Sequence, residues 1–101
     1  MKTGIELIAE ERKRQIDAEG WTSEHDKQHF SDELATVASL YAMPERQRCY
    51  DNRISPLPIN FPWSSAWWKP SPDDRIKELV KAGALIAAEI DRIQNSNPRK
   101  S

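Results

Sequence analysis

The segment Ser71–Gln94, SPDDRIKELVKAGALIAAEIDRIQ, decides the fold of this chain. It opens with a serine that can cap a helix, a proline suited to the first helical position and two aspartates that favour the positive end of the helix dipole. Apolar residues then recur at steps of three and four, which predicts a helix over residues 72–94. They are Ile76, Leu79, Val80, Gly83, Ile86, Ala87, Ile90 and Ile93. Residues 82–88 are apolar on every side, so we expect this helix to be covered on all faces, at the centre of the domain or of a homo-oligomer.

Two further helices are expected before this one. Thr3 and Glu6 have the spacing of a capping box, and Gly20 is a natural stop, which predicts a helix over residues 4–19. A second helix is expected over residues 24–43, with its cap at Ser23 or at Ser31. Its end is set by the proline that follows at position 44. The sequence therefore predicts an all-α fold, a small bundle of three main helices within a single domain over residues 1–101.

The region 44–70 shows neither helical nor strand periodicity and contains five prolines. It is also rich in aromatic residues, which disordered segments lack. We therefore expect a long ordered loop before the last helix, with its tryptophans packed on the helices and a short helical turn at 64–68. The polar tail 95–101 is expected to be frayed.

Composition limits the classes of function. The net charge is −1, from 15 basic and 16 acidic residues, which argues against binding to duplex nucleic acid. The single cysteine gives no internal disulfide framework and suits a reducing compartment. No apolar run approaches membrane-spanning length, so we expect no signal peptide, no membrane partner and a cytoplasmic location. Because 101 residues build only a small core, we also expect a homo-oligomer formed through the last helix.

A first candidate site lies in the expected second helix. His25 and His29 are four residues apart, and Asp32 follows one turn later, which is ligand spacing for a divalent metal. The alternative is a pair of histidines that form local hydrogen bonds and cap a turn.

A second candidate site consists of three glutamates, Glu33, Glu78 and Glu89. Carboxylates that face inward from neighbouring helices can hold magnesium or manganese, which can bind phosphates and activate water. The alternative is ordinary salt bridging with nearby lysines and arginines.

A third candidate site is the aromatic segment before the last helix. Flat rings beside cations would form a platform on which a base stacks while its phosphates meet the charges. The candidate ligand-binding residues are Trp63, Trp67, Trp68, Lys69, Arg75 and Lys81. The alternative is that the tryptophans complete the core of a small domain.

Residues along nearly the whole chain resemble a family of small bacteriophage and prophage proteins. The positions that carry the resemblance are Gly4-Ile5, Ile8-Ala9-Glu10-Glu11-Arg12, Glu19-Gly20-Trp21, Glu24-His25-Asp26, His29, Glu33-Leu34-Ala35, Pro62-Trp63, Trp67-Trp68-Lys69-Pro70, 81–86 and Ala88-Glu89-Ile90. This resemblance implies a phage origin and the host cell cytoplasm, but no established activity.

A looser resemblance links the segment 77–81, KELVK, to the third helix of all-α MazG-type nucleoside triphosphate pyrophosphohydrolases. In that family a Glu and an Asp three residues later hold magnesium. Glu78 matches the Glu, whereas Lys81 stands where the Asp should be. Of the three glutamates of that family's second helix, only Glu33 is present.

Three functions follow, from different classes. We favour a sponge-like counter-defence protein that binds a nucleotide or nucleotide-derived signal without turnover and needs no cofactor. The alternative is a pyrophosphohydrolase that depends on magnesium or manganese and uses Glu33, Glu78 and Glu89. A third hypothesis is an inhibitor that presents the tryptophan loop to a protein partner.

Overall fold

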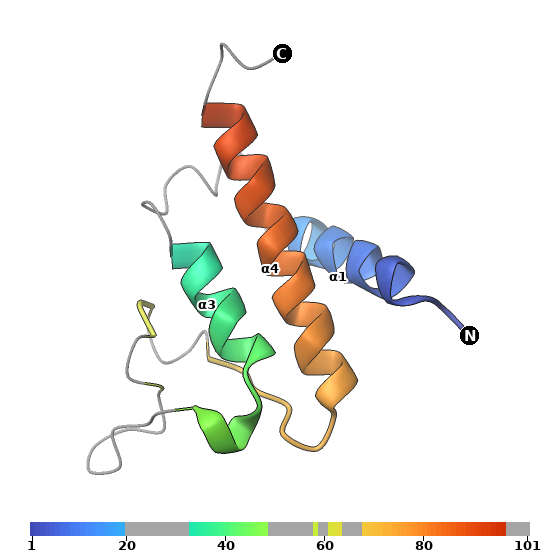
Figure 1. Ribbon diagram of the computed structural model, residues 1–101. Helices are drawn as coiled ribbons and strands as arrows, with labels where there is room; N and C mark the ends of the chain where they lie inside the picture. The colour runs from blue at the N-terminus through green and yellow to red at the C-terminus, as the bar shows by residue number, and fades with distance from the viewer. Residues whose placement is uncertain (20–32, 49–57, 59–60, 64–67, 97–101) are drawn as a thin grey trace.

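The computed structural model describes residues 1–19, 33–48, 58, 61–63 and 68–96, without the side chains of 19, 95 and 96. Within these residues the chain forms α1 (Gly4–Glu19), α3 (Glu33–Ala42), the 3₁₀ turn η1 (Glu45–Gln47) and α4 (Arg75–Ser96). Helix α4 contacts both other helices: α3 lies alongside it and α1 crosses it (Figure 1). The predicted all-α fold is confirmed.

Helix α1 spans the range that the sequence predicts, and its N-terminus has the predicted capping box. The Glu6 N–H donates to Thr3 Oγ1 at 3.2 Å, and the Thr3 N–H donates to the Glu6 carboxylate at 2.8 Å. Two backbone donors that a helix end leaves unpaired are thereby satisfied within four residues. For α3, by contrast, the expected residues 24–32 and the cap at Ser23 or Ser31 lie outside the described residues.

The last helix begins three residues later than predicted, and Ser71 is not its cap. The Asp74 N–H donates to Ser71 O at 2.9 Å, so residues 71–74 form a turn. Asp74 then caps α4, because its Oδ1 accepts the Lys77 N–H at 3.1 Å. The prediction failed here because serine and aspartate are both good caps, and local sequence does not show which one the chain turns at.

The core lies between α3 and α4. Its fully buried members are Leu34, Val37, Ala38, Tyr41, Ala82, Leu85 and Ala88. Phe61, Trp63 and Trp68 pack against this cluster, which confirms for these two tryptophans the expected packing on the helices. Of the tail 95–101 that was expected to be frayed, residues 95 and 96 instead continue α4. Trp67, most of the expected turn at 64–68 and residues 97–101 lie outside the described residues.

Helix α4 is central, but the chain by itself does not cover all its faces, so the expected cover would have to come from a second copy. Ile86, within the all-apolar stretch, is 49% exposed, and Ile90 is 51% exposed. The buried face instead carries Ala82, Leu85 and Ala88. The two alanines have small side chains, which let α3 approach closely. The larger isoleucines remain on the outside.

Helix α1 crosses α4 at Gly83. A Cβ atom built at Gly83 would lie 2.5 Å from Ile8 Cδ1 and 2.7 Å from Ile8 Cγ1, closer than real carbon atoms approach. The absence of a side chain at Gly83 is therefore what allows α1 to pack here.

No helix in the described part of the chain is long and apolar enough to cross a membrane.

Candidate functional site

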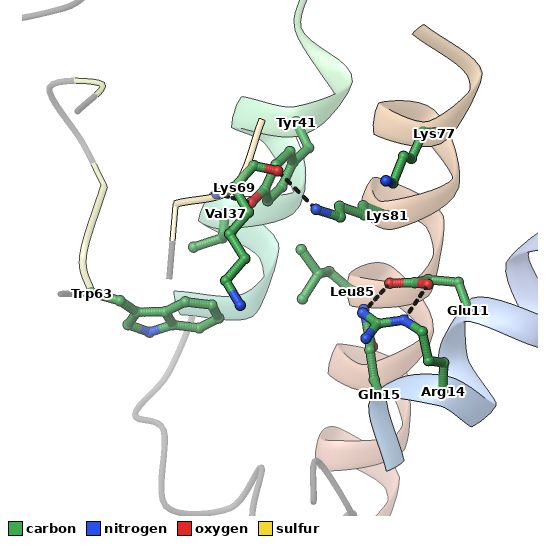
Figure 2. A pocket seen from close by; sticks show the side chains of 10 residues that line it. All are labelled: Glu11, Arg14, Gln15, Val37, Tyr41, Trp63, Lys69, Lys77, Lys81 and Leu85. Atoms are coloured by element: carbon green, nitrogen blue, oxygen red, sulfur yellow. Dashed lines mark hydrogen bonds and ion pairs between the residues drawn. The ribbon is translucent and has the colours of Figure 1, made fainter. Parts of the chain in front are cut away.

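A pocket of about 360 Å³ opens where α1, α3 and α4 meet (Figure 2). Helix α1 contributes Glu11, Arg14 and Gln15, and α4 contributes Lys77, Lys81 and Leu85. The remaining lining comes from Val37 and Tyr41 on α3 and from Trp63 and Lys69 on the loop before α4. Residues far apart in the sequence thus share one site.

The pocket lining is strongly cationic. Among the described residues that line it, Arg14, Lys69, Lys77 and Lys81 stand against a single carboxylate, that of Glu11. Arg14 and Glu11 form a bidentate pair, with both N–H···O distances at 2.8 Å. No carboxylate of the described residues forms an ion pair with Lys77 or Lys81, so the lining carries excess positive charge.

Lys81 is the most enclosed of the lysines. Its Nζ donates to Lys69 O at 2.7 Å and lies 5.4 Å from the Tyr41 ring centroid. Burial lowers the pKa of Lys81, and the neighbouring cations Lys77, Arg14 and Lys69 lower it further, against the opposing charge of Glu11. An anion in the pocket would relieve this repulsion.

Glu11 remains ionised in this setting. Burial alone would raise its pKa, but the hydrogen bond from Arg14 and the charges of Arg14 and Lys81 outweigh burial and lower it. Glu11 therefore holds the Arg14 guanidinium in place and, among the described residues, is the one carboxylate in a lining that also carries three lysines.

Aromatic and aliphatic side chains form the rest of the pocket wall. Trp63 is fixed by its indole N–H, which donates to Glu33 Oε1 at 2.7 Å. The Tyr41 hydroxyl accepts the Lys69 backbone N–H at 2.9 Å, which ties the loop to α3. Together with Leu85 and Val37, these rings give the cationic pocket an apolar side.

Gln15 adds an unusual feature to the pocket. Its side chain lines the pocket and is only 2% exposed, yet no donor among the described residues reaches its Oε1 atom. Buried polar atoms nearly always have a hydrogen-bond partner. Oε1 itself is enclosed by the protein, so it offers almost no surface to a molecule in the pocket.

The structure brings three of the six predicted ligand-binding residues together: Trp63, Lys69 and Lys81 all line the pocket. Trp68 instead stacks on Tyr41, with ring centroids 4.7 Å apart, as part of the core. Trp67 lies outside the described residues. The sequence thus grouped three residues that share one pocket lining, but it did not show that Trp68, predicted for the same site, packs in the core.

Arg75, also predicted to bind the ligand, has another role. Its guanidinium donates to the carbonyl oxygens of Tyr41 (3.1 Å), Met43 (3.3 Å) and Ala42. These are the last carbonyls of α3, which have no partner within the helix. Arg75 therefore closes the end of α3 and does not line the pocket.

Glu78 is buried against two arginines. Arg48 Nη2 lies 2.9 Å from Glu78 Oε1, Arg75 Nη1 lies 3.3 Å from the same atom, and the Ser71 N–H donates to Oε2 at 3.0 Å. Arg48 also donates to Leu40 O at 2.7 Å. Burial alone would raise the pKa of Glu78, but the hydrogen bonds from Arg48 and Ser71 lower it.

The other two glutamates of the candidate catalytic set are engaged separately. Glu33 accepts the Trp63 indole N–H, and Glu89 pairs with Arg92 at 2.6 and 3.2 Å. In the described part of the chain no three His, Cys, Asp or Glu residues gather as a metal site would require. The predicted metal ligands His25, His29 and Asp32 lie outside that part.

Sequence reasoning missed the α1 wall of the pocket. Glu11, Arg14 and Gln15 share one face of α1, at steps of three and four from Glu11, but none of them was among the predicted ligand-binding residues, because charged and polar residues on a helix usually form a solvated face. The available signal was that α1 has too few apolar residues to pack by hydrophobic contact alone.

Comparison of the chain with models of protein families, with curated proteins and with solved structures found no match.

Proposed function

We propose that the protein binds a nucleotide, or a signalling molecule derived from one, in the pocket between α1, α3 and α4 and holds it without turnover. The observation that carries this proposal is that three lysines, Lys69, Lys77 and Lys81, share one pocket with an aromatic and apolar wall. Phosphate requires cations, and a base requires a flat apolar surface, so few small metabolites use both as well as a nucleotide does. A sponge that sequesters a signal needs only such binding.

Phosphate groups would bind at the lysines. Lys81 already has one N–H on Lys69 O, which leaves its other two for a ligand. Lys77 lies one turn before Lys81 on the same helix and lines the same pocket. A ligand phosphate there would also offset the mutual repulsion that, after burial, lowers the pKa of Lys81.

The base would lie against Trp63. The Glu33 hydrogen bond holds the indole in place before a ligand arrives, so less side-chain entropy is lost on binding. The pocket volume of about 360 Å³ falls at the small end of the range of roughly 300–1,000 Å³ usual for ligand sites. This size favours a single nucleotide unit.

Titration calorimetry with nucleoside mono-, di- and triphosphates and cyclic messengers tests the proposal directly. We expect Lys81→Met and Lys77→Met each to weaken binding roughly tenfold or more, since each removes a charge-assisted contact. Lys13→Met is the matched control, because Lys13 is exposed on α1 and pairs with Asp17, away from the pocket lining. Equal binding by all three variants would refute the proposed site.

Product analysis separates binding from catalysis. After incubation with magnesium or manganese, the ligand should be recovered intact when the protein is heat-denatured. Release of pyrophosphate and a nucleoside monophosphate in the presence of metal would contradict binding without turnover and favour the hydrolase hypothesis. Binding should also weaken as salt rises, because phosphate–lysine attraction is screened.

A further inference from the structure

A second hollow lies beside the pocket, next to Lys77. It has a volume of about 380 Å³ and lies between α1 and the start of α4. Glu11, Arg14 and Lys77 line both spaces, so the two hollows are neighbours that meet at these side chains. A ligand held at Lys77 can therefore extend from the pocket into the second hollow. The described residues that line the second hollow alone are Leu7, Glu10, Asp74, Ile76 and Val80.

The second hollow has the opposite charge balance from the pocket. Among the described residues that line it, three carboxylates stand against two cations, Arg14 and Lys77. Arg14 is already held by both oxygens of Glu11. A chain of phosphates that continued past Lys77 would meet the carboxylates of Glu10 and Asp74, and groups of like charge repel when they are brought together. This balance disfavours a further phosphate beyond Lys77.

Glu10 and Asp74 give the second hollow acceptors that a ligand can reach. Asp74 is exposed, and its Oδ1 accepts the Lys77 backbone N–H at 3.1 Å. The Glu10 side chain is 54% exposed, and its Oε2 pairs with Lys2. No described residue donates to the second oxygen of either carboxylate. Because an ionised carboxylate only accepts hydrogen bonds, these oxygens suit the hydroxyl groups of a ligand.

Aliphatic side chains form the rest of the second hollow. Leu7 and Val80 are half-buried, and Ile76 is 66% exposed. No aromatic ring belongs to the described lining, so the second hollow lacks the flat surface on which a second base would stack. A sugar ring combines C–H groups, which pack on aliphatic side chains, with hydroxyls, which donate to carboxylates. The lining of the second hollow therefore matches a sugar.

Given the proposed function, on which this inference rests, we infer that the ligand is a nucleoside diphosphate whose second phosphate carries a sugar. Figure 2 shows Trp63 across the pocket from Lys77 and Lys81, so a base on Trp63 directs its phosphates toward the second hollow. The sugar occupies that hollow, with its hydroxyls on Asp74 and Glu10. The lysines then provide affinity for any nucleotide, and the second hollow selects what the diphosphate carries.

Four ligands with the same nucleoside test this inference: AMP, ADP, ATP and ADP-glucose. Titration calorimetry on the full chain should show ADP-glucose binding roughly tenfold tighter than ADP, because the sugar adds hydrogen bonds to charged groups. ATP should bind no tighter than ADP, because its third phosphate would approach the carboxylates of the second hollow. Binding of ATP more tightly than ADP-glucose would overturn the inference.

The double variant Asp74→Asn, Glu10→Gln identifies the groups responsible. Asparagine caps a helix as well as aspartate does, so α4 should stay capped. Hydrogen bonds to carboxylates are roughly twice as strong as those to neutral amides, so the advantage of ADP-glucose over ADP should fall, while ATP gains on ADP. Asp73→Asn is the matched control, because Asp73 is also exposed but is absent from the described lining of both hollows. It should leave both affinity ratios unchanged.

Ile76→Ser tests the aliphatic side of the second hollow. Because Ile76 is exposed, this variant should fold normally, which circular dichroism checks. It should weaken the binding of ADP-glucose and leave the binding of AMP and ADP unchanged, since only the sugar reaches this side chain. Ile76→Ser also serves as the test if the double variant does not fold.

The possible failures are distinguishable. Equal binding of ADP and ADP-glucose by the unaltered protein would overturn the inference while leaving nucleotide binding intact. A preference for ADP-glucose that persists unchanged in the folded variants would overturn the placement of the sugar in the second hollow. Failure of all four ligands to bind would overturn the proposed function together with this inference.

Discussion

Helix α4 packs against two helices, and the two interfaces use charge in opposite ways. On the α3 side, Arg48 and Arg75 are held by Glu78 and by the last carbonyls of α3, around an apolar core. On the α1 side, the cations that line the pocket outnumber its carboxylates, and Gln15 Oε1 has no donor among the described residues. A charge cluster in which each cation has a carboxylate or carbonyl partner stabilises the fold, whereas one in which the described cations outnumber the carboxylates is suited to bind an anionic ligand.

The largest effect is expected from Glu78→Gln. This change leaves the buried Arg48 guanidinium, and the partly exposed Arg75 beside it, facing a neutral amide. Breaking a buried pair typically costs about 3–5 kcal/mol. Urea unfolding followed by circular dichroism measures the loss. Glu10→Gln, whose carboxylate is exposed and pairs with Lys2, should change the free energy of unfolding by less than about 1 kcal/mol.

The pH dependence of stability gives a second view of Glu78. Because its pKa is lowered in the folded state, its contribution is present above the usual glutamate pKa and is lost as the pH falls through the folded-state value. The unaltered protein should therefore lose stability in acid more steeply than Glu78→Gln does. Parallel curves for the two proteins would mean that Glu78 is not stabilised by its arginines.

Gly83→Ala probes the α1 interface, and the sign of its effect is decisive. In an unobstructed helix this change would stabilise by about 0.5–1 kcal/mol. The contact with Ile8 should reverse the sign and cost about 1–3 kcal/mol, as overpacking does. Thermal unfolding measures the sign and the size of this change in stability.

Two further variants control this test. Ile8→Ala combined with Gly83→Ala should be less damaging than the sum of the single changes, because the two side chains compete for one space. Gly4→Ala, where an added Cβ meets nothing within 4 Å, should be neutral or stabilising. Additive effects of the first pair would show that α1 does not cross α4 at Gly83.

A smaller effect on stability is expected from Lys81→Met. Burial and the neighbouring cations lower the pKa of Lys81, so the unfolded chain binds more protons in the alkaline range below the usual lysine pKa. Removing this lysine should flatten the rise in stability with pH across that range and slightly raise stability near neutrality, while nucleotide binding is lost. A steeper rise of stability with pH in the variant would contradict the view that burial and neighbouring cations disfavour the charged form of Lys81.

The smallest effect on the single chain is expected from Ile90→Lys. Ile90 is half exposed, and such surface changes usually alter stability by no more than about 0.5 kcal/mol. If α4 associates with a second copy through its exposed isoleucines, as the sequence predicts, light scattering should show the mass falling to that of one chain. A single-chain mass for the unaltered protein at high concentration would refute association through α4.

The sequence by itself determined the helical class, the extent of α1, its capping box and the existence of a long helix near the C-terminus. These features depend on periodicity and on caps, which act over a few residues. It also placed Trp63, Lys69 and Lys81 in one candidate site, because they cluster near the start of the last helix. Local chemistry was sufficient for all of these.

Only the tertiary structure decided what the charged residues do. Arg75 and Glu78 were candidates for ligand and metal binding, but α3 ends beside them and its carbonyls engage Arg75, while Arg48 pairs with Glu78. Gln15 is polar, yet it is buried once α1 packs on α4. A polar side chain has the same propensities in either role, so its function depends on which partners the fold brings within reach.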